Sequence, residues 1–167
     1  PVLVKSATED ASFGISQNSI VSNDQALIDR VNFVHETVGT DALAEEFIDG
    51  RELYVGVVGN KQLNVLPVWE MFFRKMPEGV AHIATARVKW NPIYQKKHGI
   101  ETGPAQDLTD EQVTRIRRIC KRVYRALNMS GYGRIDMRMN AEGQVYVIEA
   151  NANPNLEYGE DLAESAE

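Results

Sequence analysis

The sequence has few of the residues that build disulfide-bonded or zinc-dependent folds. Its 167 residues include one cysteine, Cys120, so no disulfide can form within the chain, which excludes a disulfide scaffold and suits a reducing compartment. The three histidines lie far apart, with no cysteine or histidine at the spacing of a zinc site: His35, His82 and His98. There is no Gly-Lys-Ser/Thr phosphate loop and no visible Ser/His/Asp set, which argues against a P-loop protein and against that class of hydrolase.

The sequence also lacks a long hydrophobic run and a surplus of basic charge. No apolar segment approaches the roughly 20 residues that span a bilayer, and no charged-then-apolar leader resembles a signal peptide. Acidic residues outnumber basic ones by 24 to 18, and the net charge of −6 argues against a nucleic-acid partner and a polybasic membrane surface. We therefore expect a cytoplasmic protein that binds neither nucleic acid nor membrane.

The composition that remains is that of an ordinary globular protein. A length of 167 residues is enough for one domain, and a hydrophobic content of 43% is enough for a buried core. The chain opens on Pro1 rather than methionine and ends in an acidic stretch. We expect it to be a processed chain or a piece of a longer one.

Hydrophobic periodicity predicts strands and helices along most of the chain. Apolar runs predict strands over residues 1–5, 13–22, 42–48, 52–58 and 62–69, and the turn Gly59-Asn60-Lys61 joins the last two as a hairpin. Ser22 and Gln25 form a predicted capping box, followed by apolar residues at helical spacing as far as Gly39. Residues 72–104 show no sustained period, so they are either a functional lid or irregular structure.

A second amphipathic helix is predicted after Thr109, which forms a capping box with Gln112. Its apolar face carries Val113, Ile116, Cys120, Val123 and Leu127. Its opposite face is basic and carries Arg115, Arg118, Lys121, Arg122 and Arg125. Such a face binds phosphate or is simply solvated, and the solvated interpretation is favoured.

The clearest chemical pattern is a pair of strands near the C-terminal end. Residues 134–139 alternate strictly, so that Arg134, Asp136 and Arg138 share one face of a strand. The turn Asn140-Ala141-Glu142-Gly143 leads into a second strand over residues 144–150. Pairing Asn140 with Gly143, without a bulge, places Asp136 opposite Val147 and Arg134 opposite Glu149. Asp136 and Glu149 then become diagonal neighbours on one face.

Asn151 faces the same way as Glu149, because it lies two residues further along. Asp136, Glu149 and Asn151 would thus present hard oxygen ligands of the kind that Mg²⁺ takes, leaving positions for water and phosphate. Two carboxylates this close would repel each other without a cation. The alternative is a surface hairpin in which Arg134 and Arg138 offset the acids.

These residues resemble a known superfamily. Gly133-Arg134-Ile135-Asp136 followed by Ile148-Glu149-Ala150-Asn151 is similar to the metal-binding end of ATP-grasp ligases, most closely the D-alanine–D-alanine ligase branch. The resemblance continues in order through nearly the whole chain. Val4-Lys5 with the loop 6–14 resembles the phosphate-lid hairpin, residues 44–48 the hinge that holds adenine, residues 50–52 the ribose contact, and Val88-Lys89-Trp90 a second lysine element.

The resemblance implies a role for each matching residue. Lys5 and Lys89 would contact the phosphates of ATP. Adenine would be held by Glu45, which accepts from the amino group, and by the backbone around Glu46, Phe47 and Ile48; Glu52 would bind the ribose hydroxyls. One or two Mg²⁺ ions, or Mn²⁺ in their place, would be held by Asp136, Glu149 and Asn151. Arg134 would be catalytic, steadying the charge that develops on the acyl phosphate and the tetrahedral intermediate.

The resemblance implies an α+β ATP-grasp fold with a lid subdomain over residues 1–47 and a larger sheet-and-helix subdomain over residues 48–167. The implied reaction is the ATP-dependent joining of a carboxylate to an amine through an acyl phosphate, with a small amino acid or peptide as substrate. The alternatives are a ligase of the same superfamily for another amino acid or peptide, and a nucleotide-binding module without catalysis. The family's separate N-terminal domain is absent from these residues, and a homodimer is left open.

The chain departs from the family pattern at two loops. In the lid loop, Ala11 stands where that branch places a hydroxyl, and Glu9-Asp10 puts two acids near the phosphate site. After Asn151, the family's small glycine-containing substrate loop is replaced by residues 152–157, Ala-Asn-Pro-Asn-Leu-Glu. The second departure leaves the identity of the amine substrate open.

Overall fold

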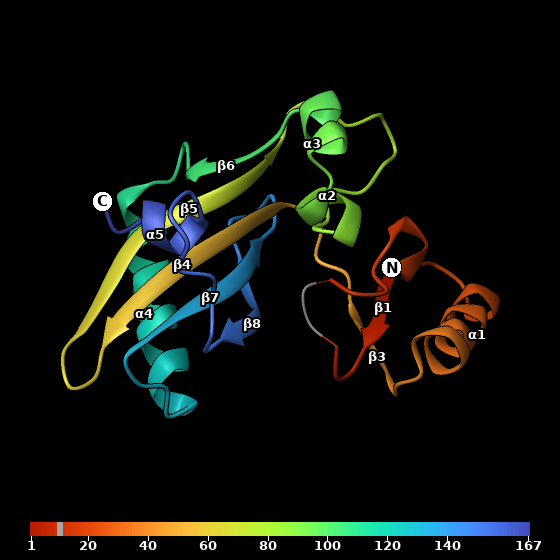
Figure 1. Cartoon of the computed structure of the whole chain (residues 1–167), viewed down its shortest axis with the longest axis horizontal. Coiled ribbons are helices and arrows are strands. Elements are labelled where there is room, and N and C mark those ends of the chain that lie inside the picture. Colours follow the sequence, from red (N-terminus) through yellow and green to blue (C-terminus); the bar gives the residue numbers. More distant parts are fainter. Residues whose placement is uncertain (10–11) are drawn as a thin grey trace. The chain divides into compact units, whose positions relative to one another are not determined.

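The computed structural model describes residues 1–9 and 12–167, which form two compact units (Figure 1). Unit 1 comprises residues 1–48 and 73–100, and unit 2 comprises residues 49–72 and 101–167. The predicted subdomain boundary at residues 47 and 48 stays a prediction; in the structure, residues 73–100 pack within unit 1. The sequence departures at Asp10 and Ala11 lie outside the described residues. None of the described helices is both long and apolar enough to cross a bilayer.

Unit 1 contains a three-stranded antiparallel sheet in the order β2-β1-β3. Its strands are β1 (Val2–Ser6), β2 (Ile20–Val21) and β3 (Ala42–Glu46). The 3-10 helix η1 (Gln17–Ser19) precedes β2, while helix α1 (Asp24–Phe33) continues as the π-helical turn η2 (Val34–Val38). Val4, Val21 and Val34 form the core between sheet and helix. The long strand predicted over 13–22 is therefore reduced to its last apolar pair.

The predicted start of the first helix is wrong by one residue. Asn23 rather than Ser22 is the N-cap, because its side chain accepts from the Ala26 amide at 2.9 Å. Gln25 does not complete a capping box but donates to Asp29 at 2.8 Å. The predicted end is confirmed: Gly39 closes the helical segment with a left-handed φ of 80°, which a glycine adopts without steric cost.

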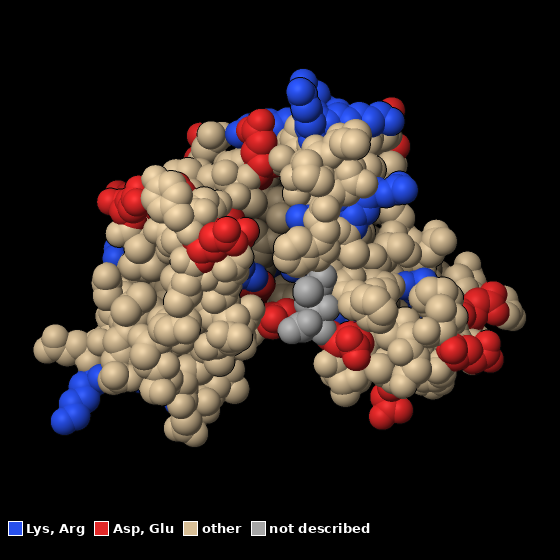
Figure 2. Space-filling view, in the orientation of Figure 1, with Lys and Arg blue, Asp and Glu red and all other residues tan. Residues whose placement is uncertain are grey.

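Residues 72–104, which show no sustained hydrophobic period, contain two short helices, α2 (Ala86–Trp90) and α3 (Pro92–His98). Asn91 lies between them and caps α3, with Pro92 in the first turn, where a missing amide hydrogen costs nothing. The last turn of α3 carries Lys96, Lys97 and His98, and basic side chains gather over α3 in Figure 2. Cations at this end of a helix complement its dipole, so the basic turn has a local structural reason.

Unit 2 is built on a five-stranded sheet in the order β6-β5-β4-β7-β8. Its strands are β4 (Arg51–Gly59), β5 (Leu63–Phe73), β6 (Ile100–Pro104), β7 (Tyr132–Met139) and β8 (Val145–Asn151). Strand β4 pairs antiparallel with β5 and β7, and β7 pairs antiparallel with β8. Helix α4 (Asp110–Ala126) and the short α5 (Asp161–Glu164) complete an α+β fold.

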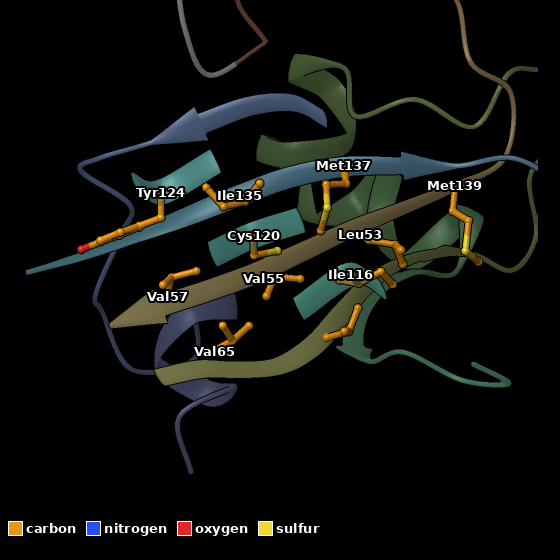
Figure 3. Close-up of a cluster of buried hydrophobic side chains, with 11 residues drawn as sticks. Leu53, Val55, Val57, Val65, Ile116, Cys120, Tyr124, Ile135, Met137 and Met139 are labelled. Carbon is orange, nitrogen blue, oxygen red and sulfur yellow. The ribbon is translucent and has the colours of Figure 1, made fainter. Parts of the chain in front are cut away.

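One face of this sheet packs against α4 and forms the main core (Figure 3). The core comprises Leu53, Val55, Val57, Val65, Val68, Ile116, Cys120, Tyr124, Ile135, Met137 and Met139. The capping box of Thr109 and Gln112 is confirmed by bonds of 3.2 and 2.9 Å. The predicted apolar face is wrong at its end, because Leu127 lies beyond the last helical residue and is 58% exposed, whereas Tyr124 is buried.

Candidate functional site

The face of the unit 2 sheet opposite α4 carries the charged residues, because residues alternate along each strand. We call it the polar face and define it by Glu52, Tyr54, Arg134, Asp136, Arg138, Glu149 and Asn151. Across β4 and β7, Glu52 lies opposite Arg138 and Tyr54 opposite Asp136. Across β7 and β8, Asp136 lies opposite Glu149 and Arg134 opposite Asn151.

The predicted pairing of Asp136 with Val147 is wrong by two residues, for two separate reasons. The turn is one residue longer than assumed, since the Asn140 amide donates to the Gln144 carbonyl at 3.1 Å. A bulge then adds a second residue, because Val147 is opposite Met137 whereas Glu149 is opposite Asp136. Because the two shifts add up to two residues, Glu149 still lies on the same face as Asp136. It lies directly opposite Asp136, whereas the predicted pairing placed it diagonally.

Arg134 and Asp136 form a bidentate ion pair along strand β7. Arg134 Nε donates to Asp136 Oδ1 at 2.7 Å, and Arg134 Nη2 donates to Oδ2 at 2.8 Å. The Arg134 and Asp136 side chains are only 16% and 11% exposed. Burial alone would lower the pKa of Arg134, but the hydrogen bonds and charge of Asp136 outweigh it and raise the pKa. Arg134 thus remains a fixed cation.

The Tyr54 ring packs against the guanidinium of Arg134 in this pair. Its ring centroid is 4.8 Å from the guanidinium carbon of Arg134, a cation–π distance, and the residue is 3% exposed. Its hydroxyl donates to Glu52 Oε1 at 2.8 Å. Burial, followed by the charges of Glu52 and Asp136, raises the pKa of Tyr54 well above its usual value, so the hydroxyl stays a donor.

Glu52, the predicted ribose ligand, is part of the same buried network. Its Oε1 accepts from Tyr54, and its Oε2 accepts from Arg138 Nη1 at 3.0 Å. Arg138 also donates to the Gly50 carbonyl at 3.0 Å. These bonds hold the Glu52 carboxylate in one position on the polar face.

The alternative of an exposed hairpin does not describe β7. Asp136 and Arg138 are 8% and 7% exposed, whereas Glu149 on β8 is exposed. The arginines do offset the acids, as that alternative supposed, but by way of buried ion pairs. Asp161 of α5 lies over the same face, with its Oδ2 3.8 Å from Arg134 Nη1.

The donor set on β7 and β8 suits a divalent cation that keeps several water or phosphate ligands. Asp136 and Glu149 are directly opposite, and Asn151 follows on the same face. Their oxygens are hard ligands, and the exposure of Glu149 leaves access from solvent. In the part of the chain that the structure describes, no group of three or more His, Cys, Asp or Glu side chains is arranged to hold a metal.

In unit 1, the structure brings together two of the predicted nucleotide ligands. Lys5 and Glu45 share the sheet face opposite the buried Val4, and their side chains form an ion pair of 2.7 Å. Glu46 faces the other way, as alternation along β3 requires. The Phe47 amide donates to the Pro1 carbonyl at 3.1 Å, and Ile48 is buried. The Phe47 amide is therefore already used within the protein.

The predicted lysine element of α2 is positioned by its neighbours. Val88 is buried and fixes the helix, whereas Lys89 is half-buried. Gln95 of α3 donates to the carbonyls of Val88 and Lys89 at 2.9 and 3.1 Å. These bonds satisfy the open carbonyls at the end of α2 and hold the backbone of Lys89.

Two residues that no sequence pattern indicated, Ser6 and Arg30, fix the ends of the loop after β1. The Ser6 hydroxyl accepts from the Thr8 and Glu9 amides at 3.2 and 3.0 Å. Arg30 donates to the Gly14 carbonyl and to Ser19 Oγ, while its Nε has no partner among the described atoms. Burial lowers the pKa of Arg30. A lone serine and a helical arginine carry no motif, so only the packing reveals them.

Comparisons with known proteins agree with this arrangement. The family described as "D-ala D-ala ligase C-terminus" matches residues 1–158. The uncharacterized protein y4sG of Sinorhizobium fredii is 34% identical over 156 residues, which are 93% of this chain and 44% of y4sG. The D-alanine–D-alanine ligase of Desulfotalea psychrophila is 29% identical over 156 residues, 93% of this chain and 45% of that ligase.

Solved structures show the same fold. A D-alanine–D-alanine ligase of Bacillus anthracis complexed with ATP has a TM-score of 0.71 at 23% identity, covering 99% of this chain and 46% of that one. The VanG D-Ala:D-Ser ligase of Enterococcus faecalis has a TM-score of 0.72 at 24% identity, with coverages of 99% and 44%. The chain thus spans less than half the length of these relatives and has their ATP-grasp fold. It belongs to the family of the D-alanine–D-alanine ligase C-terminal domain.

Proposed function

We propose that the protein is an ATP- and Mg²⁺-dependent ligase that joins a carboxylate to an amine through an acyl phosphate, similar to D-alanine–D-alanine ligase. The observation that carries the proposal is the polar face of unit 2. There Asp136 and Glu149 lie directly opposite each other, beside an arginine that is half-buried and bidentately held. Membership of the ligase family supports the same chemistry.

In unit 2, Asp136, Glu149 and Asn151 would hold Mg²⁺, and Glu52 would accept from the ribose hydroxyls. When bound, Mg²⁺ neutralises charge on the transferring phosphate. In unit 1, Lys5 and Lys89 would add positive charge against the triphosphate, and Glu45 would accept from the adenine amino group. The present Lys5–Glu45 ion pair would then be exchanged for contacts with nucleotide.

Arg134 is the proposed catalytic residue. In the first step, an oxygen of the donor carboxylate attacks the γ-phosphorus of ATP and ADP leaves; in the second, the amine displaces phosphate from the acyl carbon. Negative charge gathers on oxygen in both steps, and a cation already oriented in a partly buried site stabilises it without reorganisation. Asp136 orients the guanidinium, and Tyr54 supports it from below.

The proposal is tested on the full-length natural protein with ATP, Mg²⁺ and a panel of carboxylic acids. The panel starts from D-alanine and D-serine, which the relatives' names suggest, and includes other amino acids and dipeptides. Hydroxylamine serves as the trapping amine, because it converts an acyl phosphate to a hydroxamate. We expect ADP and hydroxamate to form together with at least one acid. ATP binding without ADP release on the whole panel would instead indicate a non-catalytic nucleotide-binding module.

Arg134→Lys separates catalysis from nucleotide binding. Lysine keeps the charge but cannot form the planar bidentate pair with Asp136. We expect kcat to fall by about 10²-fold, the usual effect of losing one oriented charge-stabilising group, with a much smaller change in the KM for ATP. Arg122→Lys, on the exposed side of α4, is the matched control and should leave kcat unchanged.

A further inference from the structure

In unit 1, hydroxyl hydrogen bonds tie the end of strand β1 to the residues that precede β3. Ser6 Oγ lies 2.8 Å from Thr40 Oγ1, although the two residues are 34 positions apart in the sequence. Thr40 Oγ1 donates to the Asp41 carbonyl at 3.2 Å, and the Ala7 amide donates to the same carbonyl at 2.9 Å. These bonds continue the pairing of β1 with β3 beyond Ser6, which lies opposite Ala42.

The Ser6 hydroxyl uses its full hydrogen-bonding capacity, which is one hydrogen to donate and two lone pairs to accept. Thr40 gives its only hydroxyl hydrogen to the Asp41 carbonyl, so the Ser6 hydroxyl donates to Thr40. The lone pairs of Ser6 Oγ accept from the Thr8 and Glu9 amides at 3.2 and 3.0 Å. An alanine at this position would remove all three bonds at once.

Ser6 occupies a position at which the pattern of β1 favours an apolar residue. Val4 and Ser6 are 0% and 6% exposed, whereas Lys5 between them faces the other side of the sheet. A buried hydroxyl costs free energy unless it is hydrogen-bonded, and an apolar side chain would pack there without that requirement. The serine at this position is therefore explained by its hydrogen bonds and not by packing.

The bonds of Ser6 fix the backbone directly after Lys5, the proposed phosphate ligand at the end of β1. The buried Val4 precedes Lys5 and the bonded Ser6 follows it, so the strand is held on both sides of the lysine. Thr8 and Glu9 are exposed, and both of their amides bond to Ser6. The place of this exposed segment beside Lys5 therefore depends on one hydroxyl group.

We propose that Ser6 and Thr40 are positioning residues that hold the segment after Lys5 in place for binding the phosphates of ATP. The inference rests on the proposed ligase function and adds a determinant of its affinity for nucleotide. If the segment is in the binding position for only a fraction of the time, the apparent affinity for ATP falls by that fraction. Adenine and ribose are assigned to other residues, so adenosine, which has no phosphate, should bind independently of the two hydroxyls.

The test compares the binding of ATP with Mg²⁺ and of adenosine to the full-length natural protein by isothermal titration calorimetry. We expect Ser6→Ala to raise the Kd for ATP about tenfold, because three hydrogen bonds are lost together, and to change the Kd for adenosine by less than about twofold. Ser22→Ala is the matched control, because it makes the same substitution at an exposed serine of unit 1, and it should change neither Kd.

Substitution of Thr40 tests the other hydroxyl and also serves if Ser6→Ala folds poorly. Thr40→Val replaces the hydroxyl by a methyl group of similar size, so the side chain no longer accepts from Ser6. We expect the Kd for ATP to rise about threefold, with the Kd for adenosine again unchanged. Thr40→Ser keeps the hydroxyl and should keep the affinity of the natural protein for ATP.

The outcomes separate the inference from the proposed function. If Ser6→Ala and Thr40→Val leave the Kd for ATP unchanged, or weaken ATP and adenosine by the same factor, the two hydroxyls do not position a phosphate-binding segment, and the ligase proposal stands. If the natural protein does not bind ATP, the proposed function fails and the inference falls with it.

Discussion

Asp136 and Glu149 lie opposite each other on the neighbouring strands β7 and β8 and are proposed to bind the same ion. They should nevertheless contribute very differently to the free energy of unfolding. Asp136→Asn removes the charge that balances Arg134, whose side chain is 16% exposed. Removing one partner of a buried pair costs about 3–5 kcal/mol. The asparagine carbonyl keeps one hydrogen bond and the site keeps some exposure, so we expect a loss of about 2–3 kcal/mol.

Glu149→Gln is the matched substitution on the opposite strand. Glu149 is exposed, and its closest cross-strand neighbour, Asp136, carries a like charge. Its neutralisation should therefore change the free energy of unfolding by no more than about 0.5 kcal/mol. Both variants should lose Mg²⁺-dependent nucleotide binding if the proposed site is right.

Urea unfolding followed by circular dichroism measures the difference, with the slope against urea concentration checked for each variant. The reasoning is refuted if the two variants unfold at the same urea concentration, because Arg134 would then not depend on Asp136 for its charge balance. Nucleotide binding with and without Mg²⁺ is measured separately, so the stability result stands on its own.

Two further predictions concern the core and the turn that precedes β4. Burial raises the pKa of the Cys120 thiol from 9.0 to about 12, so the unfolded chain ionises first as the pH rises. The contribution of the protonated thiol to the free energy of unfolding is therefore complete below about pH 9 and is lost between about pH 9 and 12, by at most about 1.4 kcal/mol per pH unit. Cys120→Ala should abolish this pH-dependent loss, which is measured by unfolding experiments across that range. Gly50→Ala should cost at least about 2 kcal/mol in urea unfolding, because Gly50 has a φ of 140° and a Cβ there would lie 2.1 Å from the Met139 carbonyl oxygen. Gly131→Ala, also at positive φ but with open space around it, should cost only about 1 kcal/mol, and equal losses for the two glycines would contradict the steric argument.

Elements with strong local signals were predictable from the sequence. The strict alternation of residues 134–139 separates Ile135 from Asp136, and the structure places them on the core and polar faces. Thr109 and Gln112 define the start of α4, because a capping box is formed by residues three apart. Residues 72–104 carried no such signal, since α2 and α3 are 5 and 7 residues long and too short to display a period.

The details of the candidate site depended on contacts that a sequence pattern does not contain. Bulges and turn lengths decide which residues of β8 oppose β7, and neither follows from the alternation. Asp161 lies 25 residues after Asp136 in the chain, and no sequence pattern links it to β7. Its approach to Arg134 could therefore be seen only in the folded structure. Tyr54 was within reach of sequence reasoning, because it alternates with Glu52 along β4 and must share its face.

The bulge between β7 and β8 also limits how this hairpin can change in length during evolution. Gaining or losing one residue between Asn140 and Ile148 would turn Glu149 and Asn151 toward α4, placing an uncompensated charge in the core. Changes of two residues would preserve the facing and could be absorbed at the exposed turn. Functional homologues should therefore differ here by even numbers of residues, a constraint that acts on the spacing between positions rather than on any single side chain.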